Sequence, residues 1–533
     1  MGVAVSVRLP FVKRFALLAI PALLANLAVA AGTTVVSAGG SVDALNVRVL
    51  GGSLGNITTS PLTLSPTFAQ ATTDYVLRCH SGINAIQVTL SAASAGKIAV
   101  GKDRGSSVTI NENLLENQAL IISGPGRGGS NDSSASGQSG QSDWAHPSGG
   151  AQYWIRCLPS DFPQLSVKKP GSPDPGWYLT GNLNSVAGSG TYAMVLNNNG
   201  TPVWYRRSIR PGAANVTLLA KDEIAWNGLG VIQNGAFEVF DLETQSTHWL
   251  SVAGIGLDFH ELQPLPNGNL ILLSSPLRSD VDVTTLGGGS HGTILDCLLL
   301  EVAPGGQIVW QWRASDHISV RESTNGYPVQ FGSITAYDAF HCNSIDVSPS
   351  SDSVLMSARH TDAVYKINKA TGTIEWKLGG NSATVDNEKV LAITRDTQGA
   401  FHAQHDARFR LNNDISLFDD QTFHSGLAAR AVEYHVDAAA GTATLVWSYA
   451  APDGGNSAAT GSFQRLSQGN DNVIGWGVKP GTLFSEVDGS GTLILDVGFP
   501  SGEVAYRVVK VPSKMLRLDL LRATAGLPPA PLP

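Results

Sequence analysis

The sequence predicts an all-β protein: a six-bladed β-propeller preceded by a small β-sandwich. Only 15% of the 533 residues are charged, against roughly 25% in an average soluble protein, and 58 residues are glycine. This composition suits a protein rich in turns and argues against helical bundles and coiled coils. Short alternating runs of polar and apolar residues, broken by Gly, Ser and Asn, fill the first part of the chain. Beyond residue 175, a pattern of strand, turn and strand recurs six times, in most cases with a glycine in the turn.

The first segment, residues 1–30, is predicted to be a signal peptide. Basic side chains precede an apolar stretch, and an A-x-A cleavage site follows at residues 28–30, so the mature chain is expected to start near Ala31. An uncleaved anchor is the alternative, although the apolar run is short for a membrane span and Pro21 interrupts it. We expect a secreted or periplasmic protein with no membrane association after cleavage.

Residues 31–165 are predicted to form the sandwich, with antiparallel strands. Within it, residues 124–150 are nearly all Gly, Ser, Asn and Gln, which is too poor in apolar side chains to pack and predicts a disordered loop. A Pro-rich stretch at 166–176 follows and is predicted to be a stiff linker. The propeller is expected over 177–510, with a C-terminal tail at 511–533.

Four cysteines are too few and too widely spaced for a zinc-ribbon pattern. Cys79 and Cys157 close two similar strand ends, Tyr-Val-Leu-Arg-Cys and Tyr-Trp-Ile-Arg-Cys, so we expect a disulfide between them in an oxidising compartment. Two unbonded buried thiols are the alternative. The sequence does not decide whether Cys297 and Cys342 are bonded.

The repeat is the basis of the propeller prediction. Gly-x-x-x-Trp recurs at 200–204, 306–310 and 372–376, where Gly permits a tight turn and Trp covers a strand face. Polar hairpin turns precede several of these runs, which gives four strands per unit. A solenoid is the structural alternative. The six outer strands end at Trp204, Leu250, Trp310, Trp376, Trp447 and Leu495.

Three predicted blades begin their first strand with a histidine: His260, His341 and His405. The first strand of each blade lines the central channel, so equivalent positions in three blades are expected to face one another at one rim. Strand alternation places Asn343 on the face of His341. Hairpin register, with a turn at about 348–352, pairs position 341 with 359 and places Arg359 beside His341.

These residues also carry a resemblance to a known family. The motifs Phe340-His341-Cys342-Asn343, Ser357-Ala358-Arg359-His360 and Gln404-His405-Asp406-Ala407, with the surrounding repeats over roughly 175–500, resemble the nucleotide-independent arylsulfotransferases. The N-terminal part resembles a cadherin-like β-sandwich. One departure is Asp419-Asp420-Gln421, which stands where the family pattern has an Asp-Asn-Gly turn.

The resemblance implies an exported six-bladed propeller that moves a sulfuryl group from a phenolic sulfate ester to a phenol through a sulfohistidine. It implies that His405 is the nucleophile and that His260, His341, Asn343 and Arg359 hold the sulfate. A neutral imidazole can attack sulfur without a strong base, and positioned donors stabilise charge spread over three oxygens. His260 or His341 is expected to protonate the departing phenolate; the sequence does not decide which.

Other assignments stay open at this point. His402, three residues before His405, is a rival nucleophile that strand phasing disfavours. His360 is expected to point to the face opposite Arg359 and to be structural. Three histidines could bind zinc, although Arg359 would repel a cation. The G-x-S-x-G pattern at 288–292 lacks a surrounding strand-to-helix turn and is expected to be a propeller loop.

We therefore predict an aryl sulfate sulfotransferase with no cofactor and no metal. Its partners are expected to be an aryl sulfate donor and a phenolic acceptor, and the formal net charge of −8 argues against nucleic acid as a partner. A non-catalytic propeller that binds a sulfated or anionic ligand is the alternative. A quinoprotein-like dehydrogenase is disfavoured because adjacent cysteines and a calcium-carboxylate set are absent from the sequence.

Overall fold

The computed structural model describes residues 45–49, 53–93, 96–124, 151–183, 186–229, 235–423, 426–466 and 471–531. The predicted signal peptide lies outside these residues, as does the predicted Gly/Ser loop apart from its first residue. The described chain is all-β: its strands are joined by turns, and its one α-helix is α1 (Leu518–Thr524). Among these residues, no helix has the length and apolar character needed to cross a bilayer.

Two sheets in the N-terminal region share one hydrophobic core. The strand orders are β1-β8-β9-β3 and β2-β4-β7, and β5 and β6 form a separate hairpin. Alternate residues of β4, such as Ile86, Val88 and Leu90, are buried in this core together with Leu120 and Ile155 of the other sheet. The strands are β1 (Leu45–Arg48), β2 (Leu54–Ser60), β3 (Asp74–Arg78), β4 (Asn84–Ala92), β5 (Ile98–Val100), β6 (Asp103–Gly105), β7 (Ser107–Leu114), β8 (Ala119–Ser123) and β9 (Gln152–Leu158).

The pairing in this region corrects the expectation of a purely antiparallel arrangement. β1 pairs with β8 in parallel, and β3 pairs with β9 in parallel. Parallel neighbours require a long connection that returns the chain to the same end of the sheet. Here the chain between β3 and β9 passes through the second sheet, so both strands enter their own sheet from the same end.

In the rest of the described chain, four strands pair in antiparallel order six times: in three separate sheets, in a five-stranded sheet and twice in a nine-stranded sheet. We call each of these groups of four strands a unit. The first three units are β11 (Trp177–Gly181), β12 (Tyr192–Leu196) and β13 (Pro202–Arg207) with β39 (Val509–Val511); β14 (Ala214–Ala220), β15 (Glu223–Asn227), β16 (Phe237–Asp241) and β17 (Ser246–Leu250); and β18 (Leu262–Pro264), β19 (Leu270–Ser274), β22 (Leu298–Val302) and β23 (Ile308–Arg313). The last three are β26 (Cys342–Val347), β27 (Ser353–Ala358), β28 (Ala363–Asn368) and β29 (Ile374–Gly379); β31 (His405–Phe409), β32 (Asp414–Asp419), β33 (Arg430–Asp437) and β34 (Thr442–Ala450); and β35 (Ser462–Arg465), β36 (Asn472–Gly475), β37 (Phe484–Val487) and β38 (Leu493–Gly498).

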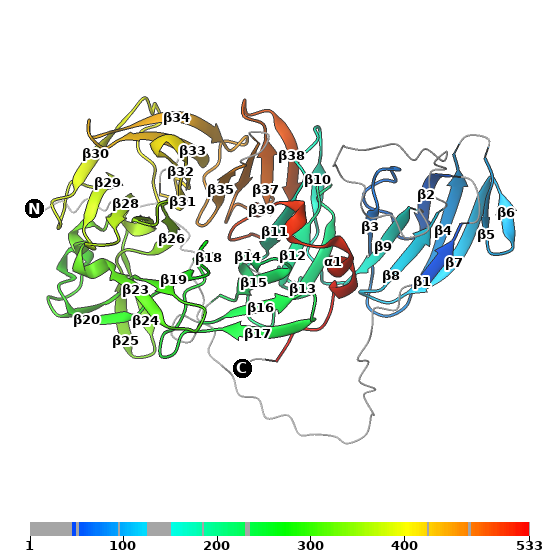
Figure 1. Cartoon of the computed structure of the whole chain (residues 1–533), viewed down its shortest axis with the longest axis horizontal. Helices are drawn as coiled ribbons and strands as arrows, with labels where there is room; N and C mark the ends of the chain where they lie inside the picture. The colour runs from blue at the N-terminus through cyan, green and yellow to red at the C-terminus, as the bar shows by residue number, and fades with distance from the viewer. Residues whose placement is uncertain are drawn as a thin grey trace, which may run out of the picture. The chain divides into compact units, whose positions relative to one another are not determined.

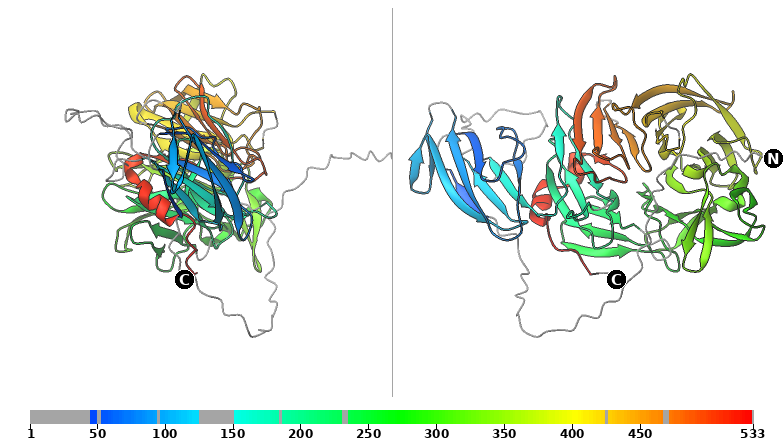
Figure 2. Two further views of the ribbon diagram at one scale, coloured as in Figure 1. Left: turned by 90° about the vertical axis from the view of Figure 1, so that its right-hand side faces the viewer. Right: turned by 180° about the vertical axis from the view of Figure 1, so that it is seen from behind.

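The innermost strands of successive units contact one another. Contacts join β14 to β18, β26 to β31, β31 to β35 and β35 to β39, while β19 contacts β26 and β39 contacts β14. β39 pairs with β11, so a strand near the C-terminus completes the unit that begins at Trp177. Figure 1 shows the units following one another around a common centre in chain order, and Figure 2 shows the same succession from behind.

The repeated sequence run corresponds to the last two strands of a unit. Gly200 adopts a φ of +68° at the turn between β12 and β13, a conformation that disfavours residues with a Cβ. Trp204 in β13 is fully buried and packs against Trp226 and Phe240 of the next unit, with ring centroids 6.1 and 6.0 Å away. The motif therefore supplies both a turn and a packing contact between units.

Additional strands extend this pattern. β20 (Leu277–Val281), β21 (Gly292–Leu295), β24 (Tyr327–Phe331) and β25 (Ile334–Asp338) form a separate sheet, which we call the inserted sheet. β30 (Lys389–Thr394) runs parallel to both β29 and β34 and joins their outer edges. The short 3-10 helices are η1 (Thr284–Leu286), η2 (Ala314–Asp316), η3 (Val320–Glu322), η4 (Arg359–Thr361), η5 (Leu411–Asn413) and η6 (Ser513–Met515).

Two segments differ from the expected linker and tail. Within the Pro-rich stretch, β10 (Ser166–Lys168) pairs with the outer edge of β38, because these three residues contain no proline and keep their N–H donors. Near the C-terminus, α1 buries Leu518 and Leu521. Arg522 on α1 donates to both carboxylate oxygens of Asp74 at 2.7 and 2.8 Å, which ties the tail to the N-terminal region.

Candidate active site

Three histidines lie where three innermost strands begin. His260 is two residues before β18, His341 is one residue before β26, and His405 is the first residue of β31. The rings of His260 and His341 meet edge to face with centroids 5.1 Å apart. The rings of His260 and His405 both lie edge-on to Tyr506, at 5.5 and 6.5 Å. The fold thus brings together residues that are 145 positions apart in the sequence.

Each of these histidines has a carboxylate beside Nδ1. His260 pairs with Asp258, His341 with Asp338 at 2.5 Å, and His405 with Asp420 at 2.7 Å. A carboxylate at Nδ1 favours the tautomer that carries its proton there and leaves the lone pair on Nε2. We call these pairs the three histidine–carboxylate pairs.

Sequence reasoning did not assign these three carboxylates. Asp258 and Asp338 lie two and three residues before their histidines, a spacing that could have indicated them. In the sequence, Asp420 stands out only as a departure from the family pattern. The structure gives that departure a role, because a carboxylate at this position faces the ring of His405.

His405 is buried, with 1% of its surface exposed. Its Nδ1 lies 3.1 Å from the carbonyl oxygen of Ala403 as well as beside Asp420. A carbonyl oxygen can only accept, so Nδ1 carries the proton and Nε2 carries the lone pair. Among the residues that the structure describes, Nε2 has no hydrogen-bond partner. The ring therefore presents an unprotonated nitrogen to the site.

Electrostatics keep His405 neutral. Burial lowers its pKa well below the usual value, and the nearby Arg359 guanidinium lowers it further. Burial also raises the pKa of Asp420 well above its usual range, while Arg359 opposes that rise. A neutral imidazole with a free Nε2 is the form that can act as a nucleophile.

Arg359 lies where the hairpin register predicts, because its backbone N–H donates to the His341 carbonyl at 2.9 Å. Its Nη1 lies 2.9 Å from Nε2 of His360, and its Nη2 donates to the Ala458 carbonyl at 3.1 Å. Its Nε is buried without a hydrogen-bond partner in the described part of the chain. Nη2 also donates to Thr422 Oγ1 at 3.5 Å, so three groups hold the guanidinium and its Nε–H is among the donors left free.

His360 corrects the expectation that it points away from Arg359. Strand β27 ends at Ala358, and Arg359 to Thr361 form the turn η4, so strand alternation does not apply to these residues. The His360 ring lies 4.6 Å from that of His341. Its Nδ1 donates to the Asp338 carbonyl at 2.7 Å, and burial lowers its pKa to about 3. Neutral His360 therefore accepts a hydrogen bond from Arg359.

Asn343 and Tyr506 lie next to the histidines. The Asn343 side chain is fully buried and donates to the Gln404 carbonyl at 2.7 Å, which ties β26 to the residue before β31. Its Oδ1 has no hydrogen-bond partner among the described residues. The Tyr506 hydroxyl lies 3.0 Å from the carbonyl oxygens of both His260 and Asn343. No motif in the sequence indicated Tyr506.

His402, the rival nucleophile, lies in the turn before β31. Its side chain is partly exposed, and its Nδ1 lies 3.6 Å from a carboxylate oxygen of Asp362. Its backbone N–H donates to Asp419 at 3.0 Å. His402 therefore lies against a different carboxylate from that of His405.

Possible metal ligands are present in the same region. Ligand atoms of Asp338, His341 and His360 lie within 4.8 Å of one another. The Nδ1 atoms of both histidines already face oxygens of Asp338, and the Arg359 guanidinium is 2.9 Å from the second histidine. A cation held here would be repelled by that guanidinium.

Disulfides join Cys79 to Cys157 and Cys297 to Cys342. The second bond anchors the residue that follows His341 to the residue that precedes β22. The start of β26 is therefore covalently fixed to the third unit, which carries His260.

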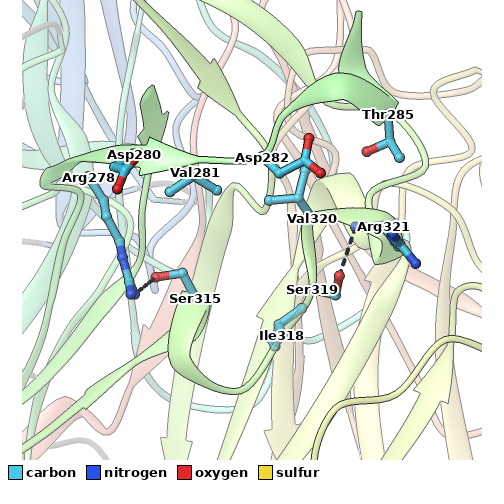
Figure 3. Close-up of a pocket in the computed structure, with 10 residues that line it drawn as sticks. All are labelled: Arg278, Asp280, Val281, Asp282, Thr285, Ser315, Ile318, Ser319, Val320 and Arg321. Atoms are coloured by element: carbon cyan, nitrogen blue, oxygen red, sulfur yellow. Dashed lines mark hydrogen bonds between the residues drawn. The ribbon is translucent and has the colours of Figure 1, made fainter. Parts of the chain in front are cut away.

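A separate hollow of about 330 Å³ lies between the inserted sheet and η3 (Figure 3). One of its charged side chains, Arg278, donates to Ser315 and Asp316, each at 2.5 Å. None of the predicted site residues lines it. The lining residues are Arg278, Asp280, Val281, Asp282, Thr285, Ser315, Ile318, Ser319, Val320 and Arg321.

Residues 235–490 match the model of the arylsulfotransferase (ASST) family. This range includes the three histidines and Arg359, and this part of the chain is similar to that family. No curated protein matches the chain.

Among solved structures, a protein of unknown function from Bacteroides caccae is 13% identical with a TM-score of 0.40, over 63% of this chain and 99% of that one. TolB from Acinetobacter baumannii is 13% identical with a TM-score of 0.38, over 64% and 69%. A putative 6-phosphogluconolactonase from Bacteroides fragilis is 17% identical with a TM-score of 0.33, over 61% and 82%.

Proposed function

We propose that this protein is an aryl sulfate sulfotransferase, which moves a sulfuryl group from a phenolic sulfate ester to a phenol through a sulfohistidine on His405. One observation carries the proposal: the buried Nε2 of His405 has a lone pair and no hydrogen-bond partner among the described residues, in a site that also holds Arg359. Leaving a buried polar atom without a partner costs stability, so such an atom calls for a functional reason. The family match agrees with this reaction class.

In the first half of the reaction, the Nε2 lone pair of His405 forms a bond to the sulfur of the donor. The bond between sulfur and the aryl oxygen breaks, and its electron pair stays on the phenolate oxygen. His260 or His341, in its doubly protonated imidazolium form, gives its Nε2 proton to that oxygen as it departs and becomes the neutral ring with its proton on Nδ1. Each ring is oriented for this by the carboxylate at its Nδ1.

In the second half, the acceptor phenol occupies the place of the departed one. Its hydroxyl proton passes to the same imidazole, and its oxygen attacks sulfur. The bond between sulfur and Nε2 breaks, and the electron pair returns to the ring. The enzyme is regenerated, and the products are a phenol and a new aryl sulfate.

Arg359 supplies the charge that both halves need. Sulfuryl transfer, like phosphoryl transfer, spreads negative charge over three nonbridging oxygens. The guanidinium is held by His360 and by the Ala458 carbonyl, and its unpartnered Nε can donate to one of these oxygens. A donor that is fixed before the reaction stabilises the transition state without reorganising.

We also infer that the six four-stranded units are the blades of a six-bladed propeller and that the two N-terminal sheets form a cadherin-like sandwich. The chain of contacts between innermost strands, completed by β39, supports the first inference. The core shared by the two N-terminal sheets supports the second.

We further propose that the protein is exported, with residues 1–30 as its signal peptide. The two disulfides support this, because such bonds persist mainly in oxidising compartments. N-terminal sequencing of the secreted or periplasmic protein tests it, and a first residue near Ala31 is expected.

The decisive experiment incubates the purified protein with 4-nitrophenyl sulfate, with and without a phenol acceptor. We expect release of 4-nitrophenolate that depends on the acceptor, and a labelled sulfuryl group on the peptide containing His405 when the acceptor is withheld. Binding of the donor with no release and no labelled peptide would replace the proposal with a non-catalytic ligand-binding role.

A further inference from the structure

Two exposed aromatic side chains lie at the candidate site. In the part of the chain that the structure describes, eleven large apolar side chains are exposed, and nine of them are aliphatic. The two aromatic ones are Tyr327, with 44% of its surface exposed, and Phe423, with 53%. Exposed aromatic rings that gather in one place often mark a binding surface.

Both rings contact the pair formed by Arg359 and His360. The Phe423 ring lies 5.4 Å from the Arg359 guanidinium carbon. The Tyr327 ring lies 5.1 Å from the His360 ring, which in turn accepts from Arg359. Neither aromatic belongs to one of the six units: Tyr327 begins β24 of the inserted sheet, and Phe423 lies between β32 and β33.

The direction of the reaction points toward these rings. Nucleophile and leaving group lie roughly in line on opposite sides of the transferred group. His405 is 1% exposed and is therefore buried more deeply than Tyr327 and Phe423. A sulfate held by Arg359 and attacked from His405 must therefore carry its aryl group away from the buried side, where the exposed rings of Tyr327 and Phe423 lie.

We propose that Tyr327 and Phe423 form the aryl-binding site for the phenolic rings of donor and acceptor. This proposal rests on the proposed sulfuryl transfer. The departing phenol and the incoming phenol occupy the same place in the two halves of the reaction, so one aromatic site serves both. Flat aromatic alcohols gain offset or edge-to-face contacts with both rings, and aliphatic alcohols do not.

The test compares ring removal with ring retention. Tyr327→Ala and Phe423→Ala should each raise KM for 4-nitrophenyl sulfate and for the phenol acceptor about 2- to 10-fold, and the double variant more, with kcat largely kept. Tyr327→Phe and Phe423→Tyr should restore wild-type KM values, since each keeps a ring. Inhibition by inorganic sulfate, which binds without an aryl group, should be unchanged in every variant.

Leu411→Ala is the matched control. Leu411 is 80% exposed and follows the end of β31 that is remote from His405, so its removal should leave all KM values unchanged. KM values within twofold of wild type in the double alanine variant would overturn the aryl-binding proposal, as would a loss of affinity that extends equally to inorganic sulfate.

A direct binding measurement separates this proposal from the proposed function. The His405→Gln variant cannot accept a sulfuryl group, and its affinity for 4-nitrophenol is read from the absorbance of that probe. Adding Tyr327→Ala and Phe423→Ala should weaken that affinity. If the wild-type protein transfers no sulfuryl group while this loss is still observed, the proposed function fails and the aryl site stands. If transfer occurs but the affinity for 4-nitrophenol does not change when both rings are removed, only the aryl-binding proposal is contradicted.

Discussion

Two clusters of buried and partly buried polar side chains contain neighbouring residues of the sequence but differ in how completely their polar atoms are paired. The site cluster contains His260, His341, Arg359 and His405. The channel cluster contains Glu261, Asp406, Arg408 and Arg507. His260 is followed directly by Glu261, and His405 by Asp406, so consecutive residues at the start of two strands enter different clusters.

The channel cluster is closed by ion pairs. Arg507 pairs with Glu261 at 3.0 Å and with Asp406 at 3.3 Å, and Arg408 pairs with the same two carboxylates at 2.8 and 2.7 Å. Two cations thus face two anions, each cation touching both. Buried charges are tolerated when they are matched in this way.

In the site cluster, several polar atoms have no hydrogen-bond partner among the described residues. Nε2 of His405 and Nε of Arg359 lack hydrogen-bond partners among the described residues, as does Oδ1 of the adjacent Asn343. Unpaired buried groups cost about 1–3 kcal/mol each, so three of them in one cluster call for a functional reason. Nε of Arg507 in the channel cluster also lacks a hydrogen bond to the described residues, but it lies 3.3 Å from Asp406 in an ion pair. The two clusters therefore differ in whether an atom without a hydrogen bond still faces an oppositely charged partner.

Removing the nucleophile should have the largest effect and should leave the fold intact. His405→Gln keeps an amide that can donate to Asp420 but has no nucleophilic nitrogen, so transfer should fall at least about 10³-fold. Acceptor-dependent release of 4-nitrophenolate measures this, and thermal unfolding serves as the control. Transfer at the wild-type rate would show that another residue, such as His402, is the nucleophile.

In the channel cluster, a substitution is expected to lower the stability of the fold. Arg507→Met leaves Glu261 and Asp406 with one cation instead of two, which should lower the free energy of unfolding by about 3–5 kcal/mol. Urea denaturation measures the loss. If the free energy of unfolding fell by less than about 1 kcal/mol, the distinction between the two clusters would not hold. Removing one ion from a paired, buried network leaves an uncompensated charge and should cost more than that.

Within the site cluster, Asp420→Asn should act through His405. An amide at this position can donate to Nδ1 and favour the tautomer with a protonated Nε2, so kcat should fall about 10- to 100-fold with little change in KM. Single-turnover labelling of His405 distinguishes slow sulfuryl uptake from slow binding. Unchanged labelling kinetics would mean that the carboxylate does not orient the ring.

Arg359→Lys tests whether the geometry of the guanidinium donors matters in addition to their charge. The ammonium group keeps the charge but loses the fixed planar donor set, so kcat/KM should fall about 10-fold while the fold is kept. Steady-state kinetics with 4-nitrophenyl sulfate measures this. Wild-type kinetics would mean that charge alone, without geometry, holds the sulfate.

The smallest effect concerns stability in mild acid. Burial lowers the pKa of His360 to about 3, below the ordinary value of 6.5, so at pH 5 the unfolded chain binds a proton that the folded one does not. Stability should therefore fall between pH 7 and pH 5, by up to about 2 kcal/mol from this residue. His360→Gln, which can still accept from Arg359, should show a shallower pH dependence in urea titrations. Identical slopes would mean that His360 is not held neutral.

Much of this arrangement follows from local pattern. Equivalent positions at the start of each innermost strand were enough to group His260, His341 and His405, and hairpin register was enough to place Arg359 opposite His341. Alternation failed at His360, because the strand ends one residue before Arg359 and a turn follows. Tyr506 could not be predicted from the sequence, because its position depends on where β39 pairs with the first unit. No local sequence pattern indicates that pairing.

The pairing of β39 with β11 also affects when the fold can be completed during synthesis of the chain. A nascent chain that stops before residue 506 already holds every histidine and Arg359, yet it lacks Tyr506, Arg507 and the strand that completes the first unit. Glu261 and Asp406 would then have only Arg408 to balance them. Synthesis must therefore reach β39 before the candidate site can assemble, and a chain that stops earlier should be less stable than one that includes this strand.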